Sequence, residues 1–194
     1  MATIRSATKS DLVQIVDLHL SAFKPSINSS MGIKRLTYLY EQTLNSRSTI
    51  LLVIVEIDEV QGFICGTSDY RAFVSESKGP ITILDMFRVF QKLGVYGLTR
   101  EIIRSLRLHR ALHGLHDIFY LSLWGMRPGL SPVLGAEIFR ELIKRSSAIR
   151  SRNLIASVET DNLRVNKMYS LLGFTEVKDL HSIRLLSKCM FDGE

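Results

Sequence analysis

The chemistry that this sequence could perform is concentrated in a strand–loop–helix segment past its middle. Ile118 to Met126 is apolar and aromatic, which is typical of a buried strand, and Arg127 to Gly129 ends it. Gly135-Ala136 is then expected to begin a helix that runs to about Arg150. A helix that starts after a strand points its free N–H groups and positive dipole end at whatever lies beyond the strand. The segment could therefore hold a phosphate group, although an ordinary strand–loop–helix unit without a ligand fits the same pattern.

A second strand and helix follow directly and carry a candidate acid–base residue. Asn153 to Val158 is a short apolar strand, and Leu163 to Leu172 is a helix that Asn162 can cap. Tyr169 lies four residues after Val165, so both side chains are expected on the face that points toward the sheet. A tyrosine there could donate a proton to a reacting group, or it could be a core residue packed on its apolar neighbours.

The segment from Asn162 to Phe174 (NLRVNKMYSLLGF) resembles the N-x-x-A-x-x-x-Y-x-x-x-G-F signature of the GNAT superfamily of acyl-CoA N-acyltransferases. Ile4 to Leu12 is similar to the superfamily's opening segment, and Gly62 to Gly66 is similar to its third strand. The three matches occur in the family's order and cover nearly the whole chain. The resemblance implies acetyl-CoA as the acyl donor, a small amine as the acceptor and no metal.

The resemblance also implies which residues hold the donor and assist the reaction. Tyr169 matches the tyrosine that protonates the departing sulfur, and Asn162 matches a residue that contacts the cofactor. By position, the backbone N–H groups of Trp124, Gly125 and Met126 would hold the acyl oxygen and the pantetheine arm. Gly125 is a candidate for a β-bulge that frees an N–H group, and a glycine merely tolerated in a strand fits equally well.

The expected pyrophosphate loop departs from the family pattern Q/R-x-x-G-x-G/A. Aligned without gaps, this chain has Ser131 to Ala136 (SPVLGA), and a shift by one residue places Gly135 in the last position. Both alignments lose the basic or amide residue and one glycine. The residues implied to contact the pyrophosphate are Ser131, Leu134, Gly135 and Ala136.

The acceptor side of the site is less well marked. Many relatives carry a Glu early in the fourth strand, where this chain has Tyr120, so no general base is assigned. Phe23, Ser30 and Tyr70 are candidate acceptor contacts from their positions alone. An amino sugar, or a sugar-nucleotide precursor of surface glycans, is the expected acceptor.

The remaining pattern predicts the elements that must position these residues. Polar or irregular segments are expected at 27–30 and 69–79. The predicted fold is one α+β domain over 1–194 with three α/β/α layers, in which helices cover both faces of a mixed, mostly antiparallel sheet of six to seven strands. Beyond the central segment, strands are expected over 3–7, 49–57, 60–68, 175–181 and 183–190, and helices over 12–23, 33–44, 80–94 and 99–114.

A basic helical insertion over 80–113 separates the third and fourth strands. Six basic residues and one acidic residue lie within 86–113, so this stretch carries almost all of the chain's net charge of +6. Thr99 is expected to cap its second helix. The side chains expected to form the inward apolar faces of the two helices are Ile83, Phe87, Phe90, Ile102, Ile103 and Leu106.

Four roles for the insertion remain open. It could be a lid over the acceptor, a peripheral contact with an anionic membrane through 86–113, a nucleic-acid contact, or a plain solvated face. No sequence motif supports nucleic-acid binding, so none is expected. A sub-group of GNAT-like proteins associated with surface-glycan gene clusters has a loosely similar insertion.

Composition restricts the setting of the protein and leaves two other functions open. Two cysteines give neither metal-ligand spacing nor a disulfide framework, and the first residues lack a signal-peptide pattern, so we expect a cytoplasmic protein. Whether it is a monomer or a homodimer is left open by the sequence. One alternative is a longer-chain acyltransferase served by acyl-CoA or acyl carrier protein, with Phe87 and Phe90 lining an acyl groove. The other is a non-catalytic module that keeps the fold.

Overall fold

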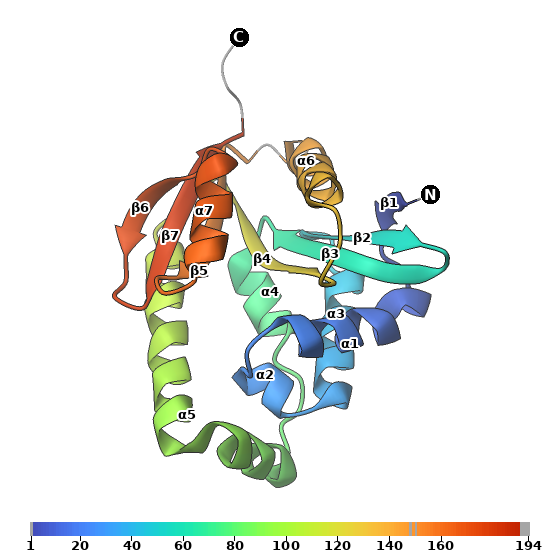
Figure 1. Ribbon diagram of the computed structural model, residues 1–194. Coiled ribbons are helices and arrows are strands. Elements are labelled where there is room, and N and C mark those ends of the chain that lie inside the picture. Colours follow the sequence, from blue (N-terminus) through green and yellow to red (C-terminus); the bar gives the residue numbers. More distant parts are fainter. Residues whose placement is uncertain (1, 148, 150, 191–194) are drawn as a thin grey trace.

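The structure is a computed structural model that describes residues 2–147, 149 and 151–190. Its strands form one sheet in the order β1-β2-β3-β4-β5-β7-β6 (Figure 1). Each neighbouring pair is antiparallel except β4 and β5, which are parallel. This confirms the mixed, mostly antiparallel sheet. The strands are β1 (Thr3–Ser6), β2 (Thr49–Glu56), β3 (Glu59–Thr67), β4 (Ile118–Met126), β5 (Asn153–Glu159), β6 (Thr175–Asp179) and β7 (Ile183–Cys189).

Helices cover both faces of the sheet, as predicted (Figure 1). The helices are α1 (Leu12–Ala22), α2 (Ile27–Ser30), α3 (Ile33–Asn45), α4 (Tyr70–Glu76), α5 (Ile83–His113), α6 (Pro132–Ser147) and α7 (Leu163–Leu171). On one face, α6 and α7 pack on the sheet through a cluster that includes Ile138, Phe139 and Tyr169. On the other face, α1 and α3 pack on β2 and β3, and the C-terminal end of α5 packs on β4, β5 and β7 through Leu112.

Two segments expected to be irregular are short helices because each begins with a polar capping residue. Ser26 caps α2, where its hydroxyl accepts from the Ser29 N–H at 3.3 Å. Asp69 caps α4, where its carboxylate accepts from the Ala72 N–H at 2.9 Å. The prediction of loops at 27–30 and 69–79 is therefore wrong, since a single cap suffices to start a helical turn.

The basic insertion contains one long helix in place of the two helices predicted over 80–94 and 99–114. Its helix α5 begins at a capping box between Thr82 and Asp85 and is interrupted at Gly94, whose φ of 64° lies outside helical geometry. Helical geometry resumes immediately, so Thr99 lies inside the helix and does not cap it. The Thr99 hydroxyl instead donates to the carbonyl of Val95 at 2.9 Å, the bond of a threonine in a helix interior.

The expected apolar faces of this insertion do not pack inward. Phe87 and Phe90 are 56% and 50% exposed, and Ile102, Ile103 and Leu106 are also exposed. The buried contacts of α5 come from Val89 and Leu112 instead. The spacing correctly grouped these residues into apolar faces, but those faces are exposed to solvent and do not pack on the rest of the molecule.

The helix after β4 begins earlier than Gly135. It starts at Pro132, whose missing N–H costs nothing at a first helical position. The Ser131 hydroxyl accepts from the Val133 N–H at 3.2 Å and so caps the first turn. The helix is described to Ser147, and Arg150, its expected end, lies outside the described residues. Across the described ranges, no helix combines the length and apolar character needed to cross a bilayer.

Candidate active site

The parallel strands β4 and β5 pair over only four residues and then separate. The last pair joins Leu121 to Ala156. At the same level, the register between β3 and β4 shifts, so that Ser122 is an extra residue between the partners of Gly66 and Cys65. A bulge bends its strand and disrupts the ladder, which accounts for the separation at this point. We call the ends that no longer pair with each other, Leu123–Met126 of β4 and Ser157–Glu159 of β5, the β4–β5 fork; each end stays paired with its other neighbour, β3 or β7.

The bulge therefore lies at Ser122. Of the two alternatives that the sequence left open for Gly125, the structure shows a glycine within a regularly paired strand and no bulge. Gly125 pairs in register with Phe63 of β3. A Cβ added at Gly125 would lie 2.8 Å from the Phe63 ring and 3.1 Å from the Phe23 ring, so close packing requires glycine here. The Ser122 hydroxyl donates to the Cys65 carbonyl at 3.0 Å, a bond that helps to hold the bulge.

Tyr169 is placed at the fork by α7, as the helical spacing predicted. Asn162 caps α7 by accepting from the Val165 N–H at 3.2 Å. The Tyr169 ring is buried and lies edge-on to the indole of Trp124, with 6.2 Å between ring centroids. The indole in turn stacks on Phe139 of α6 at 5.4 Å. Side chains from β4, α6 and α7 therefore meet on one face of the fork.

The polar atoms of this aromatic group are available to a ligand. No described residue forms a hydrogen bond with the Tyr169 hydroxyl, and the Trp124 Nε1 is buried without a partner. Burial raises the pKa of Tyr169, and the nearby phenol of Tyr120 raises it further. The hydroxyl therefore stays protonated at neutral pH and can serve as a proton donor.

The opposite face of the fork carries a second set of polar groups, most of which the sequence analysis missed. Tyr120 lies 2.8 Å, oxygen to oxygen, from the Ser157 hydroxyl, and burial raises the Tyr120 pKa. The Glu159 carboxylate accepts from Lys24 at 2.8 Å and from Arg104 at 2.9 Å. These contacts connect the segment after α1 and helix α5 to the end of β5. Glu159 could have been noticed as a carboxylate that closes a predicted strand.

The three candidate acceptor contacts are distributed around this face. The Phe23 ring lies beside Gly125 of β4. The Tyr70 ring packs edge-on against Tyr120 with 5.1 Å between centroids. Ser30 is buried in α2, which contacts α3 and α5, and its hydroxyl has no partner among the described residues. The structure thus brings Phe23 and Tyr70 against β4, whereas Ser30 lies beneath the insertion.

The loop before α6 offers backbone donors at two positions that the resemblance had implied, Ser131 and Leu134, and at one that it had not, Gly129. Gly135 donates its N–H to the Ser131 carbonyl at 3.3 Å, and a Cβ added at Gly135 would lie 2.9 Å from the sulfur of Met126. Gly135 is thus explained by close helix–strand packing. Within the described chain, the N–H groups of Gly129, Ser131 and Leu134 have no hydrogen-bond partner. Free N–H groups at a helix N-terminus suit a pyrophosphate, so the loop fits the donor in spite of its missing glycine.

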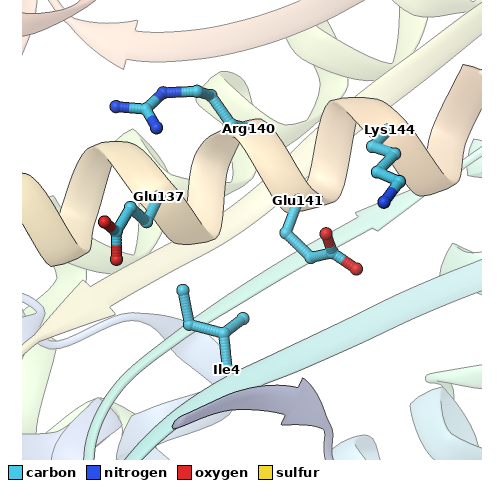
Figure 2. A pocket seen from close by; sticks show the side chains of 5 residues that line it. All are labelled: Ile4, Glu137, Arg140, Glu141 and Lys144. Carbon is cyan, nitrogen blue, oxygen red and sulfur yellow. The ribbon is translucent and has the colours of Figure 1, made fainter. Parts of the chain in front are cut away.

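Two surface hollows lie away from this group of residues. One of about 420 Å³ is bounded by Ile4 of β1 and by Glu137, Arg140, Glu141 and Lys144 along α6 (Figure 2). The other, of about 380 Å³, includes His116 and Asp117 before β4. Neither hollow contains a residue assigned to the site from sequence. The described residues include no cluster of three or more His, Cys, Asp or Glu placed to hold a metal ion.

Comparison with known proteins places the fold in a known class. No protein-family model matches the chain, and no curated protein matches it. Solved structures do match over nearly all of both chains. PaiA N-acetyltransferase from Thermoplasma acidophilum in complex with coenzyme A has a TM-score of 0.64 and 11% identity, covering 97% of this chain and 99% of that one.

Two further structures show the same likeness. NAA60 of Arabidopsis thaliana in complex with acetyl-CoA has a TM-score of 0.61 and 14% identity, covering 97% of this chain and 98% of that one. An N-acetyltransferase from Staphylococcus aureus Mu50 has a TM-score of 0.60 and 15% identity, covering 98% and 99%. The chain has the fold of the GNAT superfamily of acyl-CoA N-acyltransferases, as its sequence had indicated. These matches give no support to the glycan-associated sub-group.

Proposed function

We propose that the protein is an N-acetyltransferase that transfers an acetyl group from acetyl-CoA to a small amine. The observation that carries this proposal is the β4–β5 fork with the buried, unbonded hydroxyl of Tyr169 beside Trp124. The GNAT fold supports it, because two of the similar structures hold coenzyme A or acetyl-CoA. Both the identity of the site residues and the activity are open to direct test.

The residues of the fork have separate tasks in such a reaction. The donor supplies a thioester whose carbon is attacked by the neutral amine, so that a C–N bond forms and the C–S bond breaks. The attacking nitrogen releases one proton to solvent, and Tyr169 afterwards regains from solvent the proton that it donates. Tyr169 gives its hydroxyl proton to the departing sulfur, a role that its raised pKa permits at neutral pH. Free N–H groups of Gly129, Ser131 and Leu134 hold the pyrophosphate, and backbone N–H groups on the edge of β4 that no longer faces β5 polarise the acyl oxygen.

An amino sugar is the acceptor that we propose to test first. The acceptor face presents a hydroxyl pair at Tyr120 and Ser157 and an ionic group at Glu159 with Lys24 and Arg104. Such groups match the hydroxyls and the amine of a sugar. The alternative of a longer-chain acyltransferase requires Phe87 and Phe90 to line an acyl groove. Both side chains are about half exposed and lie outside the buried clusters, so they do not support that alternative.

The first experiment is a calorimetric titration with acetyl-CoA and with pantetheine. We expect binding of acetyl-CoA that is lost with pantetheine, because the loop N–H groups need the pyrophosphate. Turnover is then followed by chromatography of the amide product with an amino sugar, a polyamine and a peptide amino terminus. Failure of acetyl-CoA binding together with turnover of an acyl carrier protein would replace this proposal by the carrier-fed alternative.

Substitution of the proposed acid separates an enzyme from a non-catalytic module. Tyr169→Phe should lower kcat by about 100-fold or more, since general acid catalysis contributes that much. Its melting temperature should change little, because the lost hydroxyl has no partner in the described structure. Tyr96→Phe, at a tyrosine that is 83% exposed, is the matched control. Equal turnover of both variants would show that Tyr169 is a core residue only.

A further inference from the structure

Large apolar side chains are exposed along α5 from Ile83 to Leu106, with Leu84, Met86, Tyr96 and Ile103 among them. Six of them recur at spacings of three, four and seven residues, so that they form one stripe before the break at Gly94 and another after it. Each of these six side chains is between 45% and 91% exposed. We define the exposed apolar face of α5 as Ile83, Phe87, Phe90, Val95, Ile102 and Leu106.

The contacts that α5 makes with the rest of the molecule come from other sides of the helix. Val89 is fully buried, and α2 packs against this helix. Farther along, Arg104 reaches Glu159, and Leu112 packs with Tyr120. The first half of α5 projects beyond the sheet and its covering helices (Figure 1). The exposed apolar face is therefore not needed to pack α5 on the rest of the molecule, because residues on other sides of the helix make those packing contacts.

The charge of α5 indicates what could cover this face. Residues 86–113 carry six basic residues and one acidic residue. Four of the basic side chains, Arg88, Lys92, Arg100 and Arg110, are exposed. Packing two copies face to face would bring these like charges together, which opposes self-association. An anionic lipid surface satisfies both properties, since it accepts apolar side chains at the acyl boundary and basic side chains at the headgroups.

We propose that α5 binds the surface of an anionic membrane. The exposed apolar face enters the boundary between headgroups and acyl chains, and the net positive charge of residues 86–113 is attracted to the anionic headgroups. The helix lies on the bilayer and does not cross it, because no described helix is apolar enough to span one. The opposite side of α5 keeps its contacts with Glu159 and the sheet, so docking requires no rearrangement of the fork.

Co-sedimentation of the full chain with lipid vesicles tests this proposal. We expect binding to vesicles that contain about one third phosphatidylglycerol, and at least about tenfold weaker binding to pure phosphatidylcholine. The double variant Phe87→Ser, Phe90→Ser should weaken binding at least about tenfold, because it removes two large anchors. Its control, Val13→Ser with Ile57→Ser, changes side chains that are 70% and 87% exposed elsewhere and should bind normally.

A charge-matched pair separates specific docking from general attraction. Arg88→Gln with Lys92→Gln should weaken binding and reduce its salt dependence. Arg140→Gln with Lys144→Gln removes the same charge from α6 and should bind as the wild type does (Figure 2). Equal losses in both pairs would overturn the proposal. The proposal would also be overturned if the protein did not bind vesicles and instead formed a dimer, seen by sedimentation equilibrium, that the double variant Phe87→Ser, Phe90→Ser dissociates. Circular dichroism melting confirms that each variant is folded.

Discussion

The two faces of the sheet are covered in different ways. On the α6–α7 face, one continuous buried cluster joins both helices to β2, β4 and β5. On the other face, the cover is divided between a cluster under α1 and α3 and a smaller one under the end of α5. The rest of α5 leaves a stripe of apolar side chains in solvent. The first face carries Tyr169 and the loop before α6, whereas the second carries Tyr120, Glu159 and the insertion.

This difference indicates which part of the molecule is general and which is particular. In the function that we propose, the α6–α7 face supplies a proton donor and backbone N–H groups to the transfer from a thioester to an amine. The opposite face is the side from which the proposed acceptor approaches. Helix α5 contributes Arg104 to that face and exposes its apolar stripe on another side.

The largest expected effect contrasts an aromatic residue of each face. Phe139 of α6 is 2% exposed, whereas Phe87 of α5 is 56% exposed. Phe139→Ala should lower the free energy of unfolding by about 3–5 kcal/mol, because it leaves a cavity in the continuous cluster. Phe87→Ala should change it by less than about 0.5 kcal/mol. Urea denaturation of both variants measures this, and a large loss for Phe87→Ala would show that the stripe is covered within the molecule.

A smaller effect is expected from adding one methyl group at each of two glycines. At Gly125 the new Cβ would press on the rings of Phe63 and Phe23, and overpacking of this kind costs about 1–3 kcal/mol. At Gly135 it would meet only the flexible end of Met126, and the gain in helix propensity offsets part of that cost. Gly125→Ala should therefore be the more destabilising in urea denaturation. The reverse order would contradict the packing described for the fork.

The smallest effect concerns the acid sensitivity of the α1–α3 face. Burial lowers the pKa of His19 to about 4 from an ordinary value of 6.5, and its Nδ1 lies 2.8 Å from the Tyr40 hydroxyl. The unfolded chain therefore binds a proton more readily than the folded protein between these values, so stability is full above about pH 6.5 and falls as pH decreases toward 4.

Between about pH 7 and pH 5, this histidine should reduce the free energy of unfolding by about 1–2 kcal/mol. His19→Gln should be less stable overall at pH 7 but should lose less of its stability on acidification. Urea denaturation at both pH values measures the difference. An unchanged pH dependence in His19→Gln would show that His19 is solvated enough to keep its ordinary pKa.

Much of the α6–α7 face could be read from the sequence because its signals are local. Asn162 as a cap and Tyr169 on the sheet-facing side follow from helical spacing, and the structure places both as expected. The strands were located within about two residues, since apolar runs bounded by turn residues are strong signals. The mostly antiparallel sheet and the superfamily fold were likewise expected from the sequence.

Other features depended on contacts between distant segments. The bulge at Ser122 exists because of the register between β3 and β4, which no local pattern specifies, and this register decides against a bulge at Gly125, one of the two alternatives that the sequence left open. The Glu159 contacts with Lys24 and Arg104 join residues far apart in the chain. Ser131 and Leu134 were named as pyrophosphate contacts from the sequence, whereas the free N–H group of Gly129 became evident only once the start of α6 was located.

The sequence by itself determined the order of elements, the sheet-facing tyrosine and the amphipathic character of α5, because these follow from spacing within single segments. Only the tertiary structure decided where β4 and β5 separate and which side of α5 packs. Periodicity shows that a helix has an apolar stripe, but it does not show whether the chain provides a surface to cover it. For α5, the described structure covers another side, and the stripe remains exposed.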